Sequence, residues 1–277
     1  MSSWACDVGL VDWRLPERGP GAVRRAAAAG ADGIQLDFGG PDRGEWLDAP
    51  GRCDALLDAS ADTGVRLLAV AGNHLNDIGL TAQAGSGDAT RVRRFLGRVL
   101  DAAHALEVPL AFVPSFRRSA IDGPAAFERT AEVLGWAASE AESRGLLLAS
   151  ENVLDGRSAR RLAERVGSPA FRLVLDTFNP VAEGLCPADL VAEVGHLLAD
   201  QVHLKDRPPG VAVPPELTED MLDETFGALH EYRVPVRTLV LENDHRNGDP
   251  ARLDRDLARA RARAHQLTSG TGIEPAR

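Results

Sequence analysis

Eight short apolar runs alternate along this chain with eight longer segments that carry helix-like patterns of apolar residues. Several of the short runs contain no alternating polar residues, which is typical of parallel strands buried on both faces. Strands that alternate with helices indicate parallel strands joined by crossover connections. The expected strands span residues 5–10, 33–38, 65–71, 109–114, 146–150, 171–176, 201–204 and 238–242. The expected helices span residues 21–29, 51–63, 88–106, 124–144, 158–166, 187–198, 218–231 and 250–266.

Eight strand–helix units favour a closed (β/α)8 barrel of the TIM type over an open sheet. The chain has 277 residues, and such a barrel typically has about 250, so we expect one α/β domain over residues 1–267. The alternative is an open doubly wound sheet, which usually has a Gly-rich phosphate turn after its first strand. Here residues 11–14 (VDWR) follow that strand. We expect the small and polar C-terminal stretch 268–277 to be a disordered tail.

The charge and the cysteine content narrow the function classes. The chain has 41 Asp and Glu residues against 31 Lys and Arg residues, which gives a formal net charge of -10. Nucleic-acid binding favours a basic surface, so we expect no nucleic-acid partner. Cys6, Cys53 and Cys186 form no CxxC pair, which argues against a disulfide framework and favours the cytoplasm. We see no signal peptide and no apolar run near the roughly 18 residues that would span a membrane.

Each of the last four expected strands ends close to a side chain that can bind a metal ion. A single residue of this kind is more often a helix cap or a hydrogen-bonded loop residue. In a barrel, however, four consecutive strand ends converge on one site. Three carboxylates and one imidazole suit Mn²⁺, Mg²⁺ or Co²⁺, whereas Zn²⁺ is less favoured. The runs LLLASEN, FRLVLDT, QVHLKD and RTLVLEND supply the four residues, Glu151, Asp176, His203 and Glu242.

The runs GADGIQLDF, ENV, LDTFN, HLKDR and LEND resemble the xylose isomerase-like barrel superfamily of sugar isomerases and epimerases. The resemblance covers most of the chain and is strongest from the fifth strand onward. It implies an enzyme of carbohydrate metabolism in which the four residues above hold one divalent ion, with Mn²⁺ favoured. It also implies proton transfer at a carbon next to a carbonyl, through an enediolate. Glu151 and Glu242 would be the catalytic residues that carry the proton. Delivery to the opposite face of the carbon would give an epimerase, whereas transfer on one face with movement of the carbonyl would give an aldose–ketose isomerase.

Other residues near strand ends are expected to bind the substrate, a small carbohydrate-like molecule. Arg207 resembles an arginine that contacts substrate hydroxyls in the epimerases, although a surface cation is an equal alternative. Lys205 could bind a carboxylate or phosphate, or could simply pair with Asp206. His74 either faces the site or is a solvated loop residue.

Two departures from the resemblance leave the substrate undefined. Many epimerases carry a substrate-contacting His three residues after the Asp of the sixth strand, whereas this chain has Asn179, which we expect to bind substrate in its place. The second strand of the family often ends in a sugar-binding Glu, and the nearest residues here are Gln35 and Asp37. Amides at these positions change the hydrogen bonding, so the substrate need not be a simple ketohexose.

Several other functions remain as alternatives. The same metal site serves dehydratases, in which an enolate expels a hydroxyl group, and His74 would be the general acid for that lyase. A non-catalytic barrel that acts as a partner subunit is a second alternative, although the intact ligand set argues against it. The endonuclease branch of the superfamily needs a histidine-rich zinc site, and this chain has 7 His. Charged and apolar residues alternate over 255–263, which is compatible with solvent or with a homo-oligomer contact.

Overall fold

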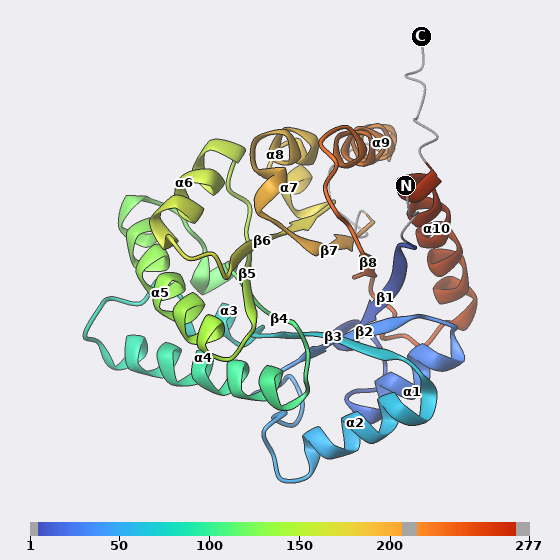
Figure 1. Cartoon of the computed structure of the whole chain (residues 1–277), viewed down its shortest axis with the longest axis horizontal. Helices are drawn as coiled ribbons and strands as arrows, with labels where there is room; N and C mark the ends of the chain where they lie inside the picture. The colour runs from blue at the N-terminus through green and yellow to red at the C-terminus, as the bar shows by residue number, and fades with distance from the viewer. Residues whose placement is uncertain (1–4, 207–214, 270–277) are drawn as a thin grey trace.

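The computed structural model describes residues 5–206 and 215–269, and in this part of the chain eight strands close into one barrel (Figure 1). All neighbouring strands are parallel, and the last strand pairs with the first. The predicted single (β/α)8 barrel is therefore confirmed. The strands are β1 (Asp7–Val11), β2 (Gly33–Asp37), β3 (Arg66–Ala71), β4 (Leu110–Pro114), β5 (Leu147–Glu151), β6 (Phe171–Asp176), β7 (Leu198–Leu204) and β8 (Thr238–Leu241).

Long helices surround the barrel and lie close to the predicted positions (Figure 1). Helix α4 is one example: Ser86 caps its first turn by accepting a hydrogen bond from the Ala89 amide, and its apolar stripe packs inward. In the described part of the chain these helices are α1 (Pro20–Ala28), α2 (Arg52–Thr63), α4 (Gly87–Ala105), α5 (Pro124–Ser143), α6 (Gly156–Val166), α8 (Pro187–Val194), α9 (Pro215–Glu231) and α10 (Pro250–Ser269).

Several short helices were not predicted, because they are too short to show a periodic pattern. Four of them follow β1, β3, β4 and β6, and they carry residues of the candidate site. The prediction of one helix over 187–198 was wrong at its end. Helix α8 stops at Val194, before the poor helix former Gly195, and β7 begins at Leu198 rather than at residue 201. The short helices are η1 (Asp12–Arg14), α3 (Leu75–Ile78), η2 (Arg117–Ser119), α7 (Asn179–Ala182) and η3 (Gly195–Leu197).

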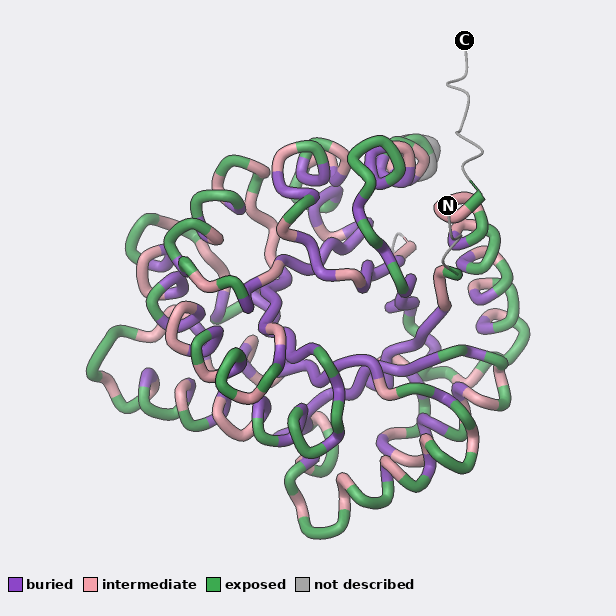
Figure 2. The backbone as a smooth tube through the Cα atoms, viewed as in Figure 1, coloured by how far each residue is buried: buried purple, intermediate pink, exposed green. Residues whose placement is uncertain are grey.

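Apolar side chains fill both the inside of the barrel and the layer between the strands and the helices. Figure 2 shows that the barrel strands are largely buried, whereas the outer helices alternate between buried and exposed residues. Inside the barrel, Leu68 fills the space that two glycines of neighbouring strands leave open. A Cβ atom would lie 2.6 Å from Leu68 if added at Gly9, and 2.7 Å from it if added at Gly33. These two glycines are therefore required by packing.

Replacing Gly33 by alanine is expected to destabilise the barrel by about 1–3 kcal/mol, which is typical of overpacking in a core. Denaturant unfolding of the variant measures this difference. The double variant Gly33→Ala/Leu68→Ala is the control, because the smaller residue 68 makes room for the new methyl group. We expect it to be more stable than the sum of the two single changes predicts. Additive effects would contradict the packing explanation.

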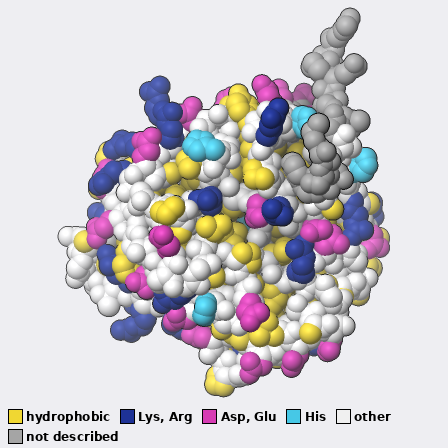
Figure 3. All heavy atoms as spheres, viewed as in Figure 1, with side chains coloured by type: hydrophobic (Ala, Val, Ile, Leu, Met, Phe, Trp, Pro, Cys, Tyr) yellow, Lys and Arg dark blue, Asp and Glu magenta, His cyan; other side chains and the backbone are white. Residues whose placement is uncertain are grey.

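The surface carries charges of both signs, and the last helix is longer than predicted. On the face shown in Figure 3, acidic and basic side chains are interspersed. Among the described residues, none of the helices is apolar over a stretch long enough to cross a bilayer. Helix α10 continues to Ser269, so it includes the first two residues of the stretch that was predicted to be a tail. The rest of that stretch, 270–277, lies outside the described residues.

Candidate metal centre and active site

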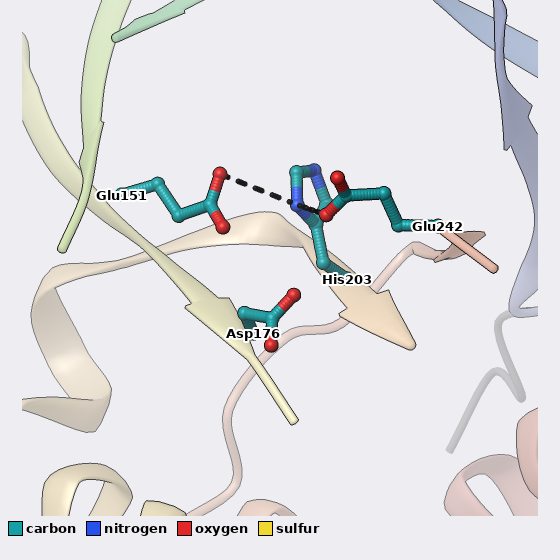
Figure 4. Close-up of side chains that lie close together, drawn as sticks. All are labelled: Glu151, Asp176, His203 and Glu242. Carbon is teal, nitrogen blue, oxygen red and sulfur yellow. Dashed lines mark ion pairs between the residues drawn. The ribbon is translucent and has the colours of Figure 1, made fainter. Parts of the chain in front are cut away.

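Four side chains from neighbouring strands meet at one end of the barrel, as the sequence predicted (Figure 4). Each offers one potential ligand atom, and these atoms all lie within 4.8 Å of one another. The strand register explains part of this meeting, because Asp176 of β6 lies directly beside His203 of β7. The Nδ1 atom of His203 is 3.6 Å from Glu151 Oε2 and 3.5 Å from Glu242 Oε2. All four residues, Glu151, Asp176, His203 and Glu242, are buried.

Two of the buried ligand atoms have no hydrogen-bond partner. Asp176 Oδ1 accepts hydrogen bonds from the backbone amides of Phe178 (2.8 Å) and Asn179 (2.6 Å), whereas Asp176 Oδ2 has no partner. The Nδ1 atom of His203 also lacks a hydrogen-bond partner. Buried polar atoms are nearly always satisfied, and a divalent cation would satisfy both. Three carboxylates and one imidazole nitrogen are also a ligand set that such ions accept. The residues therefore fit a divalent metal ion.

A chain of buried amides orients the imidazole of His203. Its Nε2 atom lies 2.9 Å from Gln35 Oε1, and Gln35 Nε2 donates to Gln201 Oε1 at 2.9 Å. Gln201 in turn donates to the carbonyl of Leu68 at 3.0 Å. Because the Gln35 oxygen must accept, Nε2 carries a proton and Nδ1 is left to bind an ion. Sequence reasoning compared Gln35 with a sugar-binding Glu, but the structure places it inside the barrel, behind His203.

Replacing Gln35 by leucine is expected to weaken metal binding roughly 10–100-fold, which is typical when the hydrogen-bond partner of a ligating His is lost. Titration against a fluorescent metal chelator measures the affinity directly. Gln35→Glu is the matched variant, because it keeps an oxygen that accepts from His203 Nε2. It should retain more of the affinity than Gln35→Leu does. Equal affinity in folded Gln35→Leu and in the original protein would exclude this positioning role.

The cluster has unusual electrostatics without an ion. Burial lowers the pKa of His203, but Glu151 and Glu242 outweigh it and raise the pKa to about 10. Burial raises the pKa of Asp176 to about 6, against the opposing effect of Lys205. The pKa of Lys205 is raised, because the carboxylates of Asp176 and Glu242 outweigh its burial. The buried carboxylates thus make this end of the barrel strongly attractive to cations.

Two of the predicted substrate-binding residues connect the candidate catalytic glutamates. Asn179 donates from Nδ2 to Glu151 Oε1 at 2.8 Å. The ammonium of Lys205 lies 3.1 Å from Asn179 Oδ1 and 3.5 Å from Glu242 Oε2. Both residues line the cavity above the cluster. Their roles in substrate binding remain predictions, but the structure does bring them to the site.

The other predicted residues are placed differently. The ring of His74 packs edge-on against Trp46 and Phe95, and His74 is not among the residues that line the cavity. Its Nδ1 atom is 3.5 Å from Asp77 Oδ2. Its predicted contact with substrate therefore stays a prediction. Arg207 lies outside the described residues, so its predicted contact with substrate stays a prediction.

The site also contains residues that sequence reasoning missed or left undecided. Glu242 Oε1 accepts hydrogen bonds from Trp13 Nε1 at 3.1 Å and from Arg14 at 3.3 Å. Neither Trp13 nor Arg14 is among the residues that the sequence predicted to bind metal or substrate. Their position directly after the first strand was the signal that could have identified them. The cavity has a volume of about 470 Å³ and is lined by Trp13, Arg14, Arg18, Asp42, Arg43, Asn73, Asn76, Pro114, Phe116, Arg117, Glu151, Asn179, Lys205, Glu242 and Arg246.

Comparison with known proteins identifies the family. The family model described as xylose isomerase-like TIM barrel matches residues 23–263. The chain belongs to the xylose isomerase-like TIM barrel family. Among its relatives is the 2-epi-5-epi-valiolone 7-phosphate 2-epimerase of Actinoplanes sp., which is 55% identical over 261 residues, or 94% of this chain and 95% of the relative. The present chain is therefore an enzyme of the isomerase and epimerase type, as its sequence predicted.

Solved structures of low sequence identity share the fold of this family member. D-psicose 3-epimerase from Clostridium cellulolyticum, solved with D-tagatose, superposes with a TM-score of 0.72 at 17% identity and covers 95% of this chain and 99% of its own. An L-ribulose 3-epimerase superposes with a TM-score of 0.71 at 16% identity and covers 98% of this chain and 100% of its own. The relatives give no support to the dehydratase alternative, and the enzyme class excludes the non-catalytic one.

Proposed function

We propose that this chain is a metal-dependent epimerase that inverts the carbon next to the carbonyl of a valiolone-type hydroxy-ketone. The observation that carries the proposal is the placement of Glu151 and Glu242, which extend toward each other from the two sides of one metal-competent cluster (Figure 4). Two carboxylates in this arrangement can reach opposite faces of a substrate carbon. The 55% identity to a 2-epimerase of 2-epi-5-epi-valiolone 7-phosphate supports this substrate class.

The two glutamates would exchange one proton with the substrate. One carboxylate removes the proton from the carbon next to the carbonyl, which yields an enediolate, and the other returns a proton to the opposite face. Hydrogen bonds hold both carboxylates in place, since Asn179 donates to Glu151 while Trp13 and Arg14 donate to Glu242. The bonds to Glu242 use its Oε1 atom, which leaves Oε2 next to His203.

A bound divalent ion would polarise the carbonyl and stabilise negative charge on its oxygen. Glu151, Asp176, His203 and Glu242 would hold this ion. We propose Mn²⁺ as the ion, because a set of three carboxylates and one imidazole is harder than the sets that zinc prefers. Mg²⁺, Co²⁺ and Zn²⁺ are the alternatives that a metal titration would compare.

The proposed substrate and the free cysteines indicate the cellular setting. A role in carbohydrate metabolism fits a small polyhydroxylated substrate, and free cysteines fit the cytoplasm. In the structure Cys6, Cys53 and Cys186 are free. We propose no nucleic-acid or membrane partner, and assembly into a homo-oligomer stays a prediction.

The direct test is to incubate the metal-loaded enzyme with 2-epi-5-epi-valiolone 7-phosphate in D₂O and to follow the reaction by NMR. We expect deuterium at the carbon next to the ketone and the appearance of the second epimer. Loss of water with formation of an alkene would instead indicate a dehydratase. No isotope exchange and no turnover with this ketone would contradict the proposed function.

A further inference from the structure

The cavity above the metal cluster is rich in cations, although the chain as a whole is acidic. Its formal net charge is -10, yet six of the fifteen residues that line the cavity are cationic and only three are acidic. A positive cavity in an acidic protein raises the local concentration of anionic ligands. The cations are Arg14, Arg18, Arg43, Arg117, Lys205 and Arg246, and the acids are Asp42, Glu151 and Glu242.

Most of these cations already have acidic partners. Arg14 is 3.3 Å from Glu242, and Arg18 is 3.4 Å from Asp12. Arg246 is held by its neighbour Asp244 through two hydrogen bonds of 2.6 Å and 2.8 Å. Two other arginines on the rim of the cavity, Arg43 and Arg117, are not paired one to one with acids.

Arg43 and Arg117 share a single carboxylate, that of Asp77 on α3. Arg43 lies 2.8 Å from Asp77 Oδ2, and Arg117 lies 2.9 Å from Asp77 Oδ1. Burial acts to raise the pKa of Asp77, but the two arginines lower it below its ordinary value, so the carboxylate is ionised. One negative charge between two guanidiniums leaves one positive charge in excess. Asp37 lies 4.0 Å from Arg43, but burial and the neighbouring Asp12 raise its pKa to about 7, so it offsets this positive charge only in part.

The backbone around this group is held in place before any ligand binds. Ser119 of η2 donates to the carbonyl of Leu75 at 2.7 Å and accepts from the amide of Leu80 at 2.7 Å. Asn76 accepts from the amide of Phe116 at 2.9 Å. These bonds join η2 to α3, so the backbone that carries Arg117 is held in place relative to that of Asp77. Preorganised donors bind a ligand with a smaller entropic loss.

Arg117 has a backbone conformation that is uncommon for a residue with a side chain. Its φ angle is 52°, in the left-handed region, where a residue other than glycine typically loses roughly 1–2 kcal/mol. Such conformations concentrate at ligand-binding sites, where the surrounding structure holds them. Asp42, which also lines the cavity, has a φ angle of 60°. The loops that carry Arg43 and Arg117 thus each contain one such residue at the cavity.

A buried amide supplies a second, independent indication of a ligand. Asn73 lies between β3 and α3 and lines the same cavity. It is only 9% exposed, and its Nδ2 donor has no hydrogen-bond partner. An unsatisfied buried donor in a native cavity calls for a partner. An oxygen of an anionic ligand would provide one after the amide turns toward the cavity, since Nδ2 itself has almost no accessible surface.

We propose that Arg43, Arg117 and Asn73 form a subsite for the phosphate group of the substrate, with Asp77 holding the two arginines in position. This inference rests on the proposed function, and it extends that function by assigning residues that select a phosphorylated hydroxy-ketone over the free one. Paired guanidiniums match phosphate oxygens in geometry and charge. The metal cluster binds the reacting end of the substrate, and the rim of the cavity binds the remote phosphate.

The test compares two ketones in each variant: 2-epi-5-epi-valiolone 7-phosphate and its form without phosphate. Arg43→Gln and Arg117→Gln should each raise KM for the phosphorylated ketone roughly 10–100-fold, which is the loss expected for a hydrogen bond to a charged group. The kcat should change much less, and kcat/KM for the free ketone should stay the same. A folding defect would lower kcat/KM for both ketones equally. The side chain of Arg117 is 60% exposed, so we expect its replacement to leave the fold intact.

Arg246→Gln is the matched control, because it removes one positive charge from the same cavity without touching the subsite. If the preference for the phosphorylated ketone falls in the two subsite variants and not in this control, the subsite is supported. An unchanged preference in both subsite variants overturns the proposal. An equal loss in all three variants also overturns it, since that would show a diffuse field rather than a defined site.

Binding of inorganic phosphate separates this proposal from the proposed function. The thermal unfolding midpoint is measured with phosphate and with chloride at equal ionic strength, in both metal-loaded and chelator-treated protein. We expect phosphate to stabilise the original protein in both states, and Arg43→Gln and Arg117→Gln to lose this effect. If neither ketone reacts but phosphate still binds in this way, the proposed function fails and the subsite stands. No stabilisation of the original protein by phosphate overturns the subsite.

Discussion

Replacing Glu151 or Glu242 by glutamine is expected to reduce epimerisation by about 10²–10⁴-fold, the contribution that is typical of a positioned general acid or base. Glutamine keeps the size of the side chain and one oxygen that can bind an ion, but it cannot carry a proton. The two glutamates extend toward each other over the cluster, so each should serve one face of the substrate carbon. Turnover of both epimers, followed by NMR in D₂O, measures the effect.

The isotope pattern gives this prediction its sharpest form. In a mechanism with two bases, each variant should still exchange the proton of the one epimer that its remaining glutamate can reach. The epimer that exchanges should therefore differ between Glu151→Gln and Glu242→Gln. Full interconversion in both variants would refute the assignment of the two glutamates.

Two controls separate a lost base from a lost ion. Metal analysis of each purified variant should show that the ion is retained. Glu164→Gln removes a carboxylate that is 68% exposed on α6, and it should leave turnover unchanged. A variant that loses its metal together with its activity would test the ligand role of the glutamate instead of its proton transfer.

The barrel and the four potential ligands could be predicted because both depend on local signals. Buried parallel strands show as continuous apolar runs, and His203 and Asp176 each stand at or next to the end of such a run. Closure of the barrel then brings the ends of β5 to β8 together. Once the chain is expected to form a barrel, each strand end therefore predicts one ligand of the shared metal site.

The rest of the site depends on contacts between distant segments, which leave no periodic signal. Gln35 stands between Ile34 and Leu36 on β2, and all three residues are buried. A polar residue between apolar ones normally indicates a side chain that faces solvent, so the sequence does not reveal that Gln35 lies behind His203. Arg117 and Asp77 come from two elements of three and four residues. Their pairing follows from the junction of η2 with α3, and sequence spacing does not show that junction.

The placement of Asn179 shows how the two kinds of signal combine. Sequence comparison identified it as a departure from a substrate-contacting His. In the structure its amide nitrogen bonds Glu151 and its oxygen accepts from Lys205. A histidine could not donate to one neighbour and accept from the other in the same way unless it were neutral. The departure is therefore consistent with a network built around Lys205.

Removing the divalent ion with a chelator is expected to abolish epimerisation and to lower the thermal stability of the protein. Within the buried cluster the carboxylates repel one another, and Asp176 Oδ2 has no hydrogen-bond partner. An ion that binds only the folded state stabilises it by about 2.7 kcal/mol when its free concentration is one hundred times its Kd. The measurement is the unfolding midpoint and the turnover, before chelation, after chelation and after addition of Mn²⁺.

Asp176→Asn provides the decisive comparison, because it keeps the size of the side chain and the Oδ1 acceptor that caps the amides of Phe178 and Asn179. Because the remaining oxygen keeps that capping role, an NH2 group takes the place of Oδ2, and an NH2 group cannot bind a cation. The unfolding midpoint of this variant should therefore change little on addition of Mn²⁺, whereas that of the original protein should rise. The variant should also lose turnover, since the buried Asp176 carboxylate would no longer hold the ion. Full turnover in protein shown by elemental analysis to be free of metal would require a different explanation of the cluster, in which Lys205 and the protonated His203 balance the three carboxylates.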